Sequence, residues 1–170
     1  TGHGHIGFRS SIEQSCDDFY YKGSLKIGIG KMSATLEKLG IGQKTGIDLH
    51  NEFVGINPNK EWKEQRLKKP WYIGETVISS IGQGNMLTTP LQIARFTAFF
   101  ANGKLPKPHL TKDDYEEPKE LDFKKEHIKL MQEGMFDVAN SPSGTAKRYI
   151  NSKVKIAAKT GTAQVVSIPQ

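Results

Sequence analysis

The sequence lacks several features that would assign it to a class of protein directly. Its one cysteine, Cys16, rules out an internal disulfide and leaves the redox compartment open. Its densest apolar stretch, IARFTAFFA, is far shorter than the roughly 20 residues that cross a bilayer. No signal peptide opens the chain, and we expect that Thr1 is not its natural start. With 36% hydrophobic and 25% charged residues, the sequence is typical of a soluble globular domain.

The sequence also lacks a segregated block of one charge, despite a net charge of +6. Its richest basic stretch, KEWKEQRLKK at residues 60–69, is interrupted by two glutamates, and DDYEEPKELD at residues 113–122 is acidic. No nucleic-acid recognition motif accompanies the basic surplus. We therefore expect no nucleic-acid partner and interpret the charge as solvated surface with a small attraction for an anionic substrate.

Apolar spacing and capping residues predict a mixture of helices and a strand. The clearest helix lies in TTPLQIARFTAFFANG, where Thr89 caps the helix, Pro90 opens it and Gly103 ends it. The same reasoning predicts other helices over residues 16–27, 32–39 and 124–139, with one helical turn near residue 62. Alternating apolar residues predict a strand over residues 154–166.

The tripeptide Lys-Thr-Gly occurs twice, in different settings. Lys44–Gly46 lies in a glycine-rich connection after a predicted helix, whereas Lys159–Gly161 lies within the predicted strand. On an edge strand, a lysine and a threonine can line a cleft and hold a carboxylate, and a glycine leaves room for a substrate backbone. The second copy is therefore the candidate for an active site.

Longer strings of the sequence resemble one protein family. These strings are KTGIDL, EWKEQRLKKPWYIGET, IGQGNMLTTPLQIARFTAFFANG and SGTAKRYINSKVKIAAKTGTAQV, and the resemblance covers residues 2–166. They are similar to class B penicillin-binding proteins of the elongation type, the penicillin-binding protein 2 group. In that superfamily, a Lys-Thr-Gly strand is one of three signature elements. The resemblance implies the penicillin-binding protein and β-lactamase fold, an α/β structure with a mostly antiparallel sheet flanked by helices.

The resemblance implies catalytic roles for three residues. The second signature, Ser-x-Asn, matches Ser15–Asp17, where aspartate replaces asparagine in a form that this group accepts. Ser15 would relay a proton to the leaving amine, and Asp17 would hold the lysine beside the nucleophile. Lys159, on an edge strand across the cleft from Ser15, would supply positive potential. A helix cap is the structural alternative for Ser15 and Asp17, and the two roles can coexist.

The resemblance also assigns substrate contacts to the second Lys-Thr-Gly copy. Thr160 and Thr162 would bind the terminal carboxylate, and Gly161 would leave room for the substrate. The backbone N–H of Thr162 would form half of the oxyanion hole. Lys44–Gly46 matches a loop of the family and is expected to be structural.

The third signature, Ser-x-x-Lys, carries the nucleophile, and we expect it upstream of Ser15 and absent from this chain. Residues 1–170 are therefore predicted to be a partial transpeptidase domain, without the nucleophile segment and without terminal strands and a helix. The implied enzyme is a serine-type peptidoglycan D,D-transpeptidase that cross-links stem peptides through an acyl-enzyme and is a β-lactam target. Alternatives with the same fold are a D,D-carboxypeptidase and a non-catalytic β-lactam sensor. A β-lactamase is disfavoured, because the chain has no Glu-x-x-Leu-Asn.

The resemblance further implies partners, a location and a metal. The protein would act at the periplasmic face of the bacterial inner membrane, anchored by an upstream segment, with the rod-complex proteins RodA and MreC. Catalysis would need no cofactor.

Some elongation-type members bind a structural zinc, and here His3 and Cys16 would be ligands together with two upstream aspartates. His5 is an alternative to His3, and a small buried apolar role is the alternative for Cys16.

Overall fold

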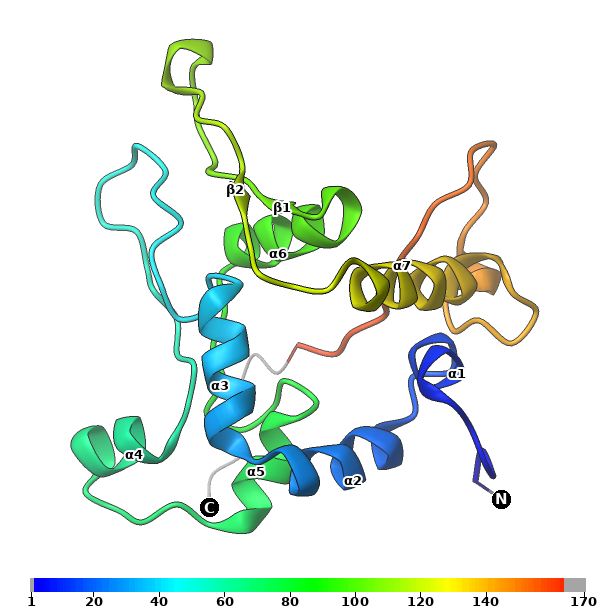
Figure 1. Cartoon of the computed structure of the whole chain (residues 1–170), viewed down its shortest axis with the longest axis horizontal. Helices are drawn as coiled ribbons and strands as arrows, with labels where there is room; N and C mark the ends of the chain where they lie inside the picture. Colours follow the sequence, from blue (N-terminus) through cyan, green and yellow to red (C-terminus); the bar gives the residue numbers. More distant parts are fainter. Residues whose placement is uncertain (1, 164–170) are drawn as a thin grey trace. The chain divides into compact units, whose positions relative to one another are not determined.

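The computed structural model describes residues 2–163 and divides into two compact units (Figure 1). The terminal unit combines Thr1–Phe19 with Lys125–Gln170, and the middle unit is Tyr20–Lys124. Among the described residues, no helix is both long enough and apolar enough to span a membrane.

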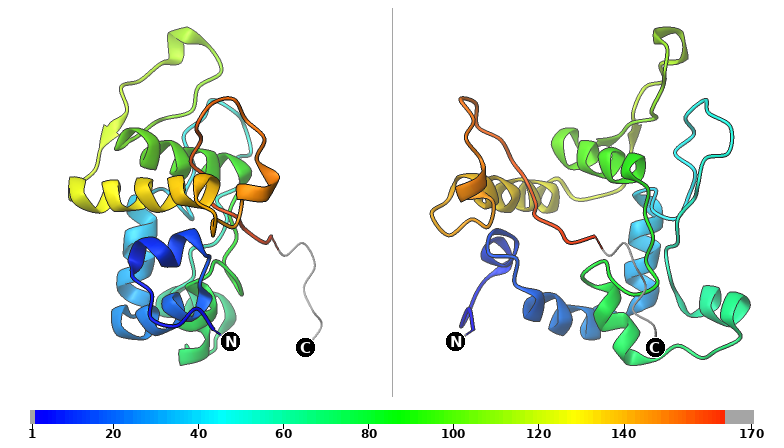
Figure 2. Two further views of the ribbon diagram at one scale, coloured as in Figure 1. Left: turned by 90° about the vertical axis from the view of Figure 1, so that its right-hand side faces the viewer. Right: turned by 180° about the vertical axis from the view of Figure 1, so that it is seen from behind.

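The terminal unit is built on the contact between helix α1 (Phe8–Glu13) and helix α7 (Lys125–Asn140) (Figures 1 and 2). The two helices approach so closely at Gly134 that a Cβ there would lie 2.7 Å from the side chain of Ile12. The guanidinium of Arg9 binds the Asp137 carboxylate through two nitrogens, with one N–O distance of 2.9 Å. The buried side chain of Val138 completes this small core. Helix α2 (Asp17–Ile27) begins in this unit, and the 3-10 helix η2 (Lys147–Tyr149) follows α7.

The middle unit contains four helices between α2 and α7. These are α3 (Ile29–Lys38), α4 (Lys60–Leu67), α5 (Ile73–Ser79) and α6 (Pro90–Asn102). The ends of α6 follow the predicted chemistry, because the side chain of Thr89 accepts a hydrogen bond from the backbone of Gln92 and Gly103 takes the left-handed conformation. Phe99 of this helix is almost fully buried and packs against the ring of Phe123.

The described part of the sheet is small. Strands β1 (Lys104–Leu105) and β2 (Lys119–Glu120) pair in antiparallel register, with Lys104 opposite Glu120. The 3-10 helix η1 (Lys112–Asp114) lies in the loop between them. The predicted fold class is confirmed by the structural relatives reported below, but residues 2–163 contribute only this two-stranded sheet to it.

The strand predicted at residues 154–166 is not found in the part of that segment that the structure describes. From residue 154 to Ala163 the backbone forms no strand, and residues 164–166 lie outside the described residues. The segment instead lies along α7, where the N–H of Ala158 donates to the carbonyl of Met135 at 2.9 Å and Asn140 Nδ2 donates to the carbonyl of Ile156 at 2.8 Å. A strand needs a neighbouring strand to complete its backbone hydrogen bonds. Within the described residues this segment hydrogen-bonds to helix α7 instead. Lys159 therefore does not lie on an edge strand here.

The other predicted elements agree with the structure to within a few residues. The helices expected at 16–27, 32–39 and 124–139 correspond to α2, α3 and α7. The single turn expected near residue 62 is the eight-residue helix α4. The short helices α1 and α5 were not predicted, since six or seven residues give too little periodicity to recognise.

Candidate active site

Ser15 lies in a strained turn between α1 and α2. Its backbone N–H donates to the carbonyl of Ile12 at 3.3 Å, and that of Cys16 donates to the carbonyl of Ser11 at 3.0 Å. These two bonds form the Schellman motif that ends a helix, in which the position of Ser15 is usually glycine. Ser15 has a φ of +53°, a conformation that costs a non-glycine residue about 1–2 kcal/mol. Strain of this kind is concentrated at functional sites.

Lys159 reaches Ser15 across 144 residues of sequence. Its Nζ donates to Ser15 Oγ at 2.6 Å and to the backbone carbonyl of Thr160 at 3.0 Å. Thr160 Oγ1 lies 3.5 Å from the same nitrogen. Both partners belong to the terminal unit, so the structure brings together two of the predicted site residues.

The environment of the Lys159 ammonium affects its charge. Lys159 as a whole is exposed, but its ammonium group lies among Ser15 and Thr160. Partial desolvation lowers the pKa of Lys159 below its ordinary value, and the carboxylate of Asp17 opposes that change. Asp17 is exposed in the first turn of α2, where a negative charge also favours the helix. Asp17, the third residue predicted to be catalytic, therefore acts on the Lys159 ammonium through its charge.

This arrangement can support proton transfer. Because the ammonium of Lys159 donates to Ser15 Oγ, the hydroxyl proton of Ser15 is available to a group in front of it. A positive charge beside a hydroxyl makes it a better proton donor. The pair can therefore deliver a proton to a leaving group, provided that a substrate lies within hydrogen-bond reach.

The residues after Lys159 leave open space. Thr160, Gly161 and Thr162 are all exposed, and a Cβ at Gly161 would meet nothing within 4 Å. Thr160 Oγ1 lies 3.0 Å from Thr145 Oγ1, so Thr160 is held by the loop that follows α7. An exposed backbone with hydroxyl groups at both sides of a glycine is suited to a substrate that carries a carboxylate.

Residues that the sequence did not indicate connect the Ser15 segment to the loop after α7. The buried carboxylate of Glu13 accepts hydrogen bonds from the hydroxyls of Ser141 and Ser143. The loop that carries these serines continues to Thr145. The string SGTA in this loop was part of the sequence resemblance, but a lone glutamate in α1 carries no motif that could have indicated the contact.

The two metal ligands predicted within this chain, His3 and Cys16, differ in exposure. His3 is exposed, whereas Cys16 is buried with 8% of its surface exposed. Within residues 2–163, no three His, Cys, Asp or Glu side chains are grouped so that they could hold a metal ion. The burial of Cys16 fits its alternative role as a small apolar residue.

One string of the sequence does read Ser-x-x-Lys, at Ser152–Lys155, contrary to the expectation that the chain holds no copy. Both residues are exposed in the loop after η2. The hydroxyl oxygen of Ser152 accepts a hydrogen bond from the backbone of Val154, and the ammonium of Lys155 lies 5.8 Å from the ring centre of Phe136. Each of the two side chains thus has another partner, and neither contact places Lys155 as a base for Ser152.

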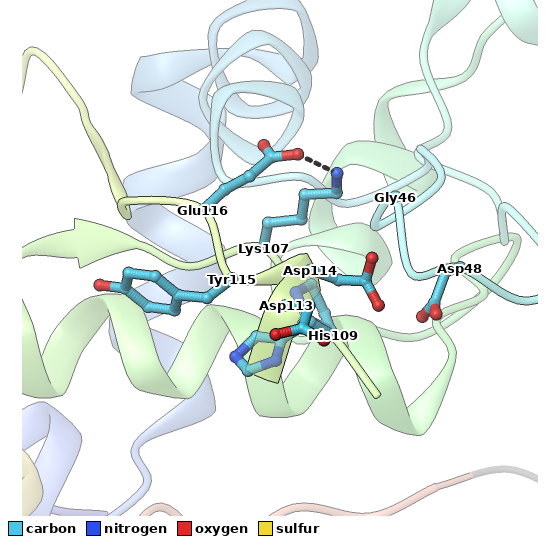
Figure 3. A pocket seen from close by; sticks show the side chains of 9 residues that line it. Gly46, Asp48, Lys107, His109, Asp113, Asp114, Tyr115 and Glu116 are labelled. Atoms are coloured by element: carbon cyan, nitrogen blue, oxygen red, sulfur yellow. Dashed lines mark hydrogen bonds and ion pairs between the residues drawn. The ribbon is translucent and has the colours of Figure 1, made fainter. Parts of the chain in front are cut away.

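The middle unit contains a hollow of about 260 Å³ beneath the loop between β1 and β2 (Figure 3). Its lining includes the ion pair of Lys107 and Glu116 and the carboxylates of Asp48 and Asp113. None of the residues predicted for the active site lines it. The hollow therefore plays no part in the candidate site.

Comparison with known proteins identifies the family. The model of the penicillin binding protein transpeptidase domain matches residues 1–168. The chain belongs to this transpeptidase family. Among curated relatives, peptidoglycan D,D-transpeptidase MrdA of Escherichia coli is 39% identical over 180 residues, which cover 98% of this chain and 28% of the relative. MrdA of Acinetobacter baumannii is 39% identical over 182 residues, covering 100% of this chain and 27% of the relative. The chain thus spans less than a third of these relatives.

Solved structures of the transpeptidase family share the fold. Penicillin-binding protein PBP2 of Helicobacter pylori, in a complex with MreC, is 43% identical with a TM-score of 0.93, over 97% of this chain and 31% of that one. PBP2 of Pseudomonas aeruginosa, in complex with WCK 5153, is 35% identical with a TM-score of 0.86, over 94% of this chain and 39% of that one. The agreement covers almost all of this chain and less than half of each solved chain.

Proposed function

We propose that residues 1–170 are the C-terminal part of the transpeptidase domain of an elongation-type peptidoglycan D,D-transpeptidase. The observation that carries the proposal is the hydrogen bond from Lys159 Nζ to Ser15 Oγ, which joins the two signature elements of this chain. The names of the relatives support the same activity, as peptidoglycan D,D-transpeptidases. The nucleophilic serine and its lysine would lie upstream of residue 1.

The proposed reaction gives the residues of this chain distinct tasks. The upstream serine attacks the carbonyl of the penultimate D-alanine of a stem peptide, an ester forms and the amide to the last D-alanine breaks. The upstream lysine takes the proton of the attacking serine and passes it to Ser15 Oγ, which gives its own proton to the leaving amine. Lys159 stabilises negative charge on Ser15 Oγ during this transfer. The amine of a second stem peptide then attacks the ester and releases the enzyme. Asp17 would orient the upstream lysine.

The exposed segment after Lys159 would hold the substrate. The hydroxyls of Thr160 and Thr162 would bind the terminal carboxylate, and the N–H of Thr162 would donate to the developing oxyanion. The open space around Gly161 supports this assignment, since the peptide backbone must lie against it. β-Lactams would enter the same site as the stem peptide.

The partners and the location are proposed from the relatives. A PBP2 structure contains MreC, and another relative was solved in a peptidoglycan synthase complex. By similarity, the whole protein would be anchored in the inner membrane with its catalytic domain in the periplasm, next to MreC and RodA. A structural zinc would need two upstream aspartates besides His3 and Cys16, since residues 2–163 contain no group of three such ligands. No step of the proposed reaction runs through a metal.

The proposal can be tested by mapping the acylated serine of the full-length protein. A labelled penicillin should attach to one serine, and mass spectrometry of the digest should place it upstream of residue 1. An adduct on Ser152 or on any other serine of this chain would contradict the proposal. Turnover of a stem pentapeptide with and without an acceptor amine distinguishes cross-linking from carboxypeptidase activity, and acylation without any turnover would indicate a sensor.

A further inference from the structure

The buried carboxylate of Glu13 lies close to Ser15 in the chain. Glu13 is the last residue of α1, two positions before Ser15, and only 8% of its surface is exposed. Its Oε1 accepts hydrogen bonds from the hydroxyls of Ser141 and Ser143, the second at 2.8 Å. Its backbone carbonyl accepts from the N–H of Thr145 at 3.2 Å. One residue of the Ser15 segment therefore holds the loop after α7 at three points.

The same loop reaches the segment that carries Lys159. Thr145 Oγ1 lies 3.0 Å from Thr160 Oγ1, and the N–H of Ala146 donates to the carbonyl of Val138 at 3.0 Å. Gly144 lies so close to the end of α7 that a Cβ there would be 2.4 Å from the carbonyl oxygen of Val138. The loop is thus held against α7, and it contacts both the segment that carries Ser15 and the segment that carries Lys159.

We propose that Glu13 is a positioning residue for the Ser15–Lys159 pair. By binding the two serine hydroxyls, it fixes the 141–146 loop, and through Thr145 and Thr160 this loop sets the distance at which the Lys159 ammonium meets Ser15. The carboxylate touches neither reacting atom. The inference rests on the proposed function.

The test is a double-mutant cycle in the full-length protein, with the acylation rate of a labelled penicillin as readout. Glu13→Ala should lower that rate by about 10- to 100-fold, the range expected for losing buried hydrogen bonds. In a Ser15→Ala background, the same change should lower it by less than about 3-fold, because a residue that acts through Ser15 has nothing left to position. Equal losses in both backgrounds would overturn the proposal.

Two further variants separate positioning from folding. Glu13→Gln retains an acceptor oxygen of the same reach and should recover the rate to within about 3-fold of the native protein. Glu133→Ala removes another α7-to-α1 carboxylate contact, to Arg9 at 3.3 Å, and should leave the acylation rate unchanged. If Glu13→Ala fails to fold, Ser143→Ala removes one of the same bonds and should show the same dependence on Ser15.

The outcomes distinguish this proposal from the proposed function. If Ser15→Ala acylates at the native rate, the site assignment itself fails. If Ser15→Ala is slow but Glu13→Ala acylates normally while folded, only the positioning role fails. A Glu133→Ala loss as large as that of Glu13→Ala would also overturn it, since general loosening of α1 would then explain the effect.

Discussion

The two Lys-Thr-Gly copies have the same letters and contrasting surroundings. In the first copy, Thr45 is 3% exposed, and the backbone N–H groups of Thr45 and Gly46 donate to the carboxylate of Glu52. In the second, all three residues are exposed, and the Lys159 ammonium donates to Ser15 from a distant segment. The first copy uses its polar groups to hold a loop. The second joins distant segments through the side chains of Lys159 and Thr160, and it leaves open space at Gly161.

The largest difference is expected at Ser15, the partner of the second copy. Ser15→Ala in the full-length protein should lower penicillin acylation by about 100-fold or more, the usual loss for an acid–base group. Ser15→Gly should lose as much activity, yet it should be about 1 kcal/mol more stable than Ser15→Ala because glycine relieves the positive φ. Acylation rates and thermal unfolding of both variants check this. A stable Ser15→Gly protein with native acylation would contradict the role of the hydroxyl.

The two glycines should separate stability from activity. Gly46 has a φ of +83°, so Gly46→Ala should lower the free energy of unfolding by about 1 kcal/mol and leave acylation within about 2-fold. At Gly161 no neighbour lies within 4 Å of a new Cβ. Gly161→Ala should therefore keep its stability and lose about 10-fold in acylation, as the methyl group displaces the substrate. If Gly46→Ala lost acylation and Gly161→Ala lost stability instead, the roles assigned to the two glycines would be wrong.

The smallest effect on activity is expected at Glu52, the partner of the first copy. Burial would raise the pKa of Glu52, but hydrogen bonds from Thr45 and Gly46 outweigh it and lower the pKa below its ordinary value of 4.5. A carboxyl with a lowered folded pKa contributes stability that is present above pH 4.5 and lost as the pH falls below it.

Glu52→Gln should therefore be less stable than the native protein at neutral pH, by about 1.5 kcal/mol for hydrogen bonds to a charged group. The gap in melting temperature should narrow as the pH falls below 4.5, while acylation stays within about 2-fold of native. Melting curves across this pH range check the sign. A gap that widens toward acid pH would mean that the charge of Glu52 does not stabilise the loop.

Local chemistry made part of the fold predictable. The limits of α6 follow from Thr89, Pro90 and Gly103, because caps act on adjacent backbone groups. The strand predicted at 154–166 was wrong over its described part, because an alternating pattern of apolar residues does not supply the neighbouring strand that a sheet needs. The packing of α1 on α7 also depends on contacts far apart in sequence, such as Gly134 against Ile12.

The candidate site was predictable only where a family motif carried it. Ser15 and Lys159 are 144 residues apart, and nothing in their local sequence indicates that they meet. The resemblance supplied that pairing. Glu13 and Thr145 were missed because a single carboxylate and a single threonine have no spacing to recognise, and their roles arise only when α1 and the 141–146 loop come together.

The most direct test of the account compares the two lysines in the full-length protein. We would measure the second-order rate of penicillin acylation for Lys159→Ala and for Lys44→Ala, each checked for native melting behaviour. Lys159→Ala should be slower by about 100-fold or more, because the ammonium beside Ser15 is lost, whereas Lys44→Ala should stay within about 2-fold of native. Native acylation in Lys159→Ala, or equal losses in both variants, would contradict the assignment of the second Lys-Thr-Gly copy to the active site.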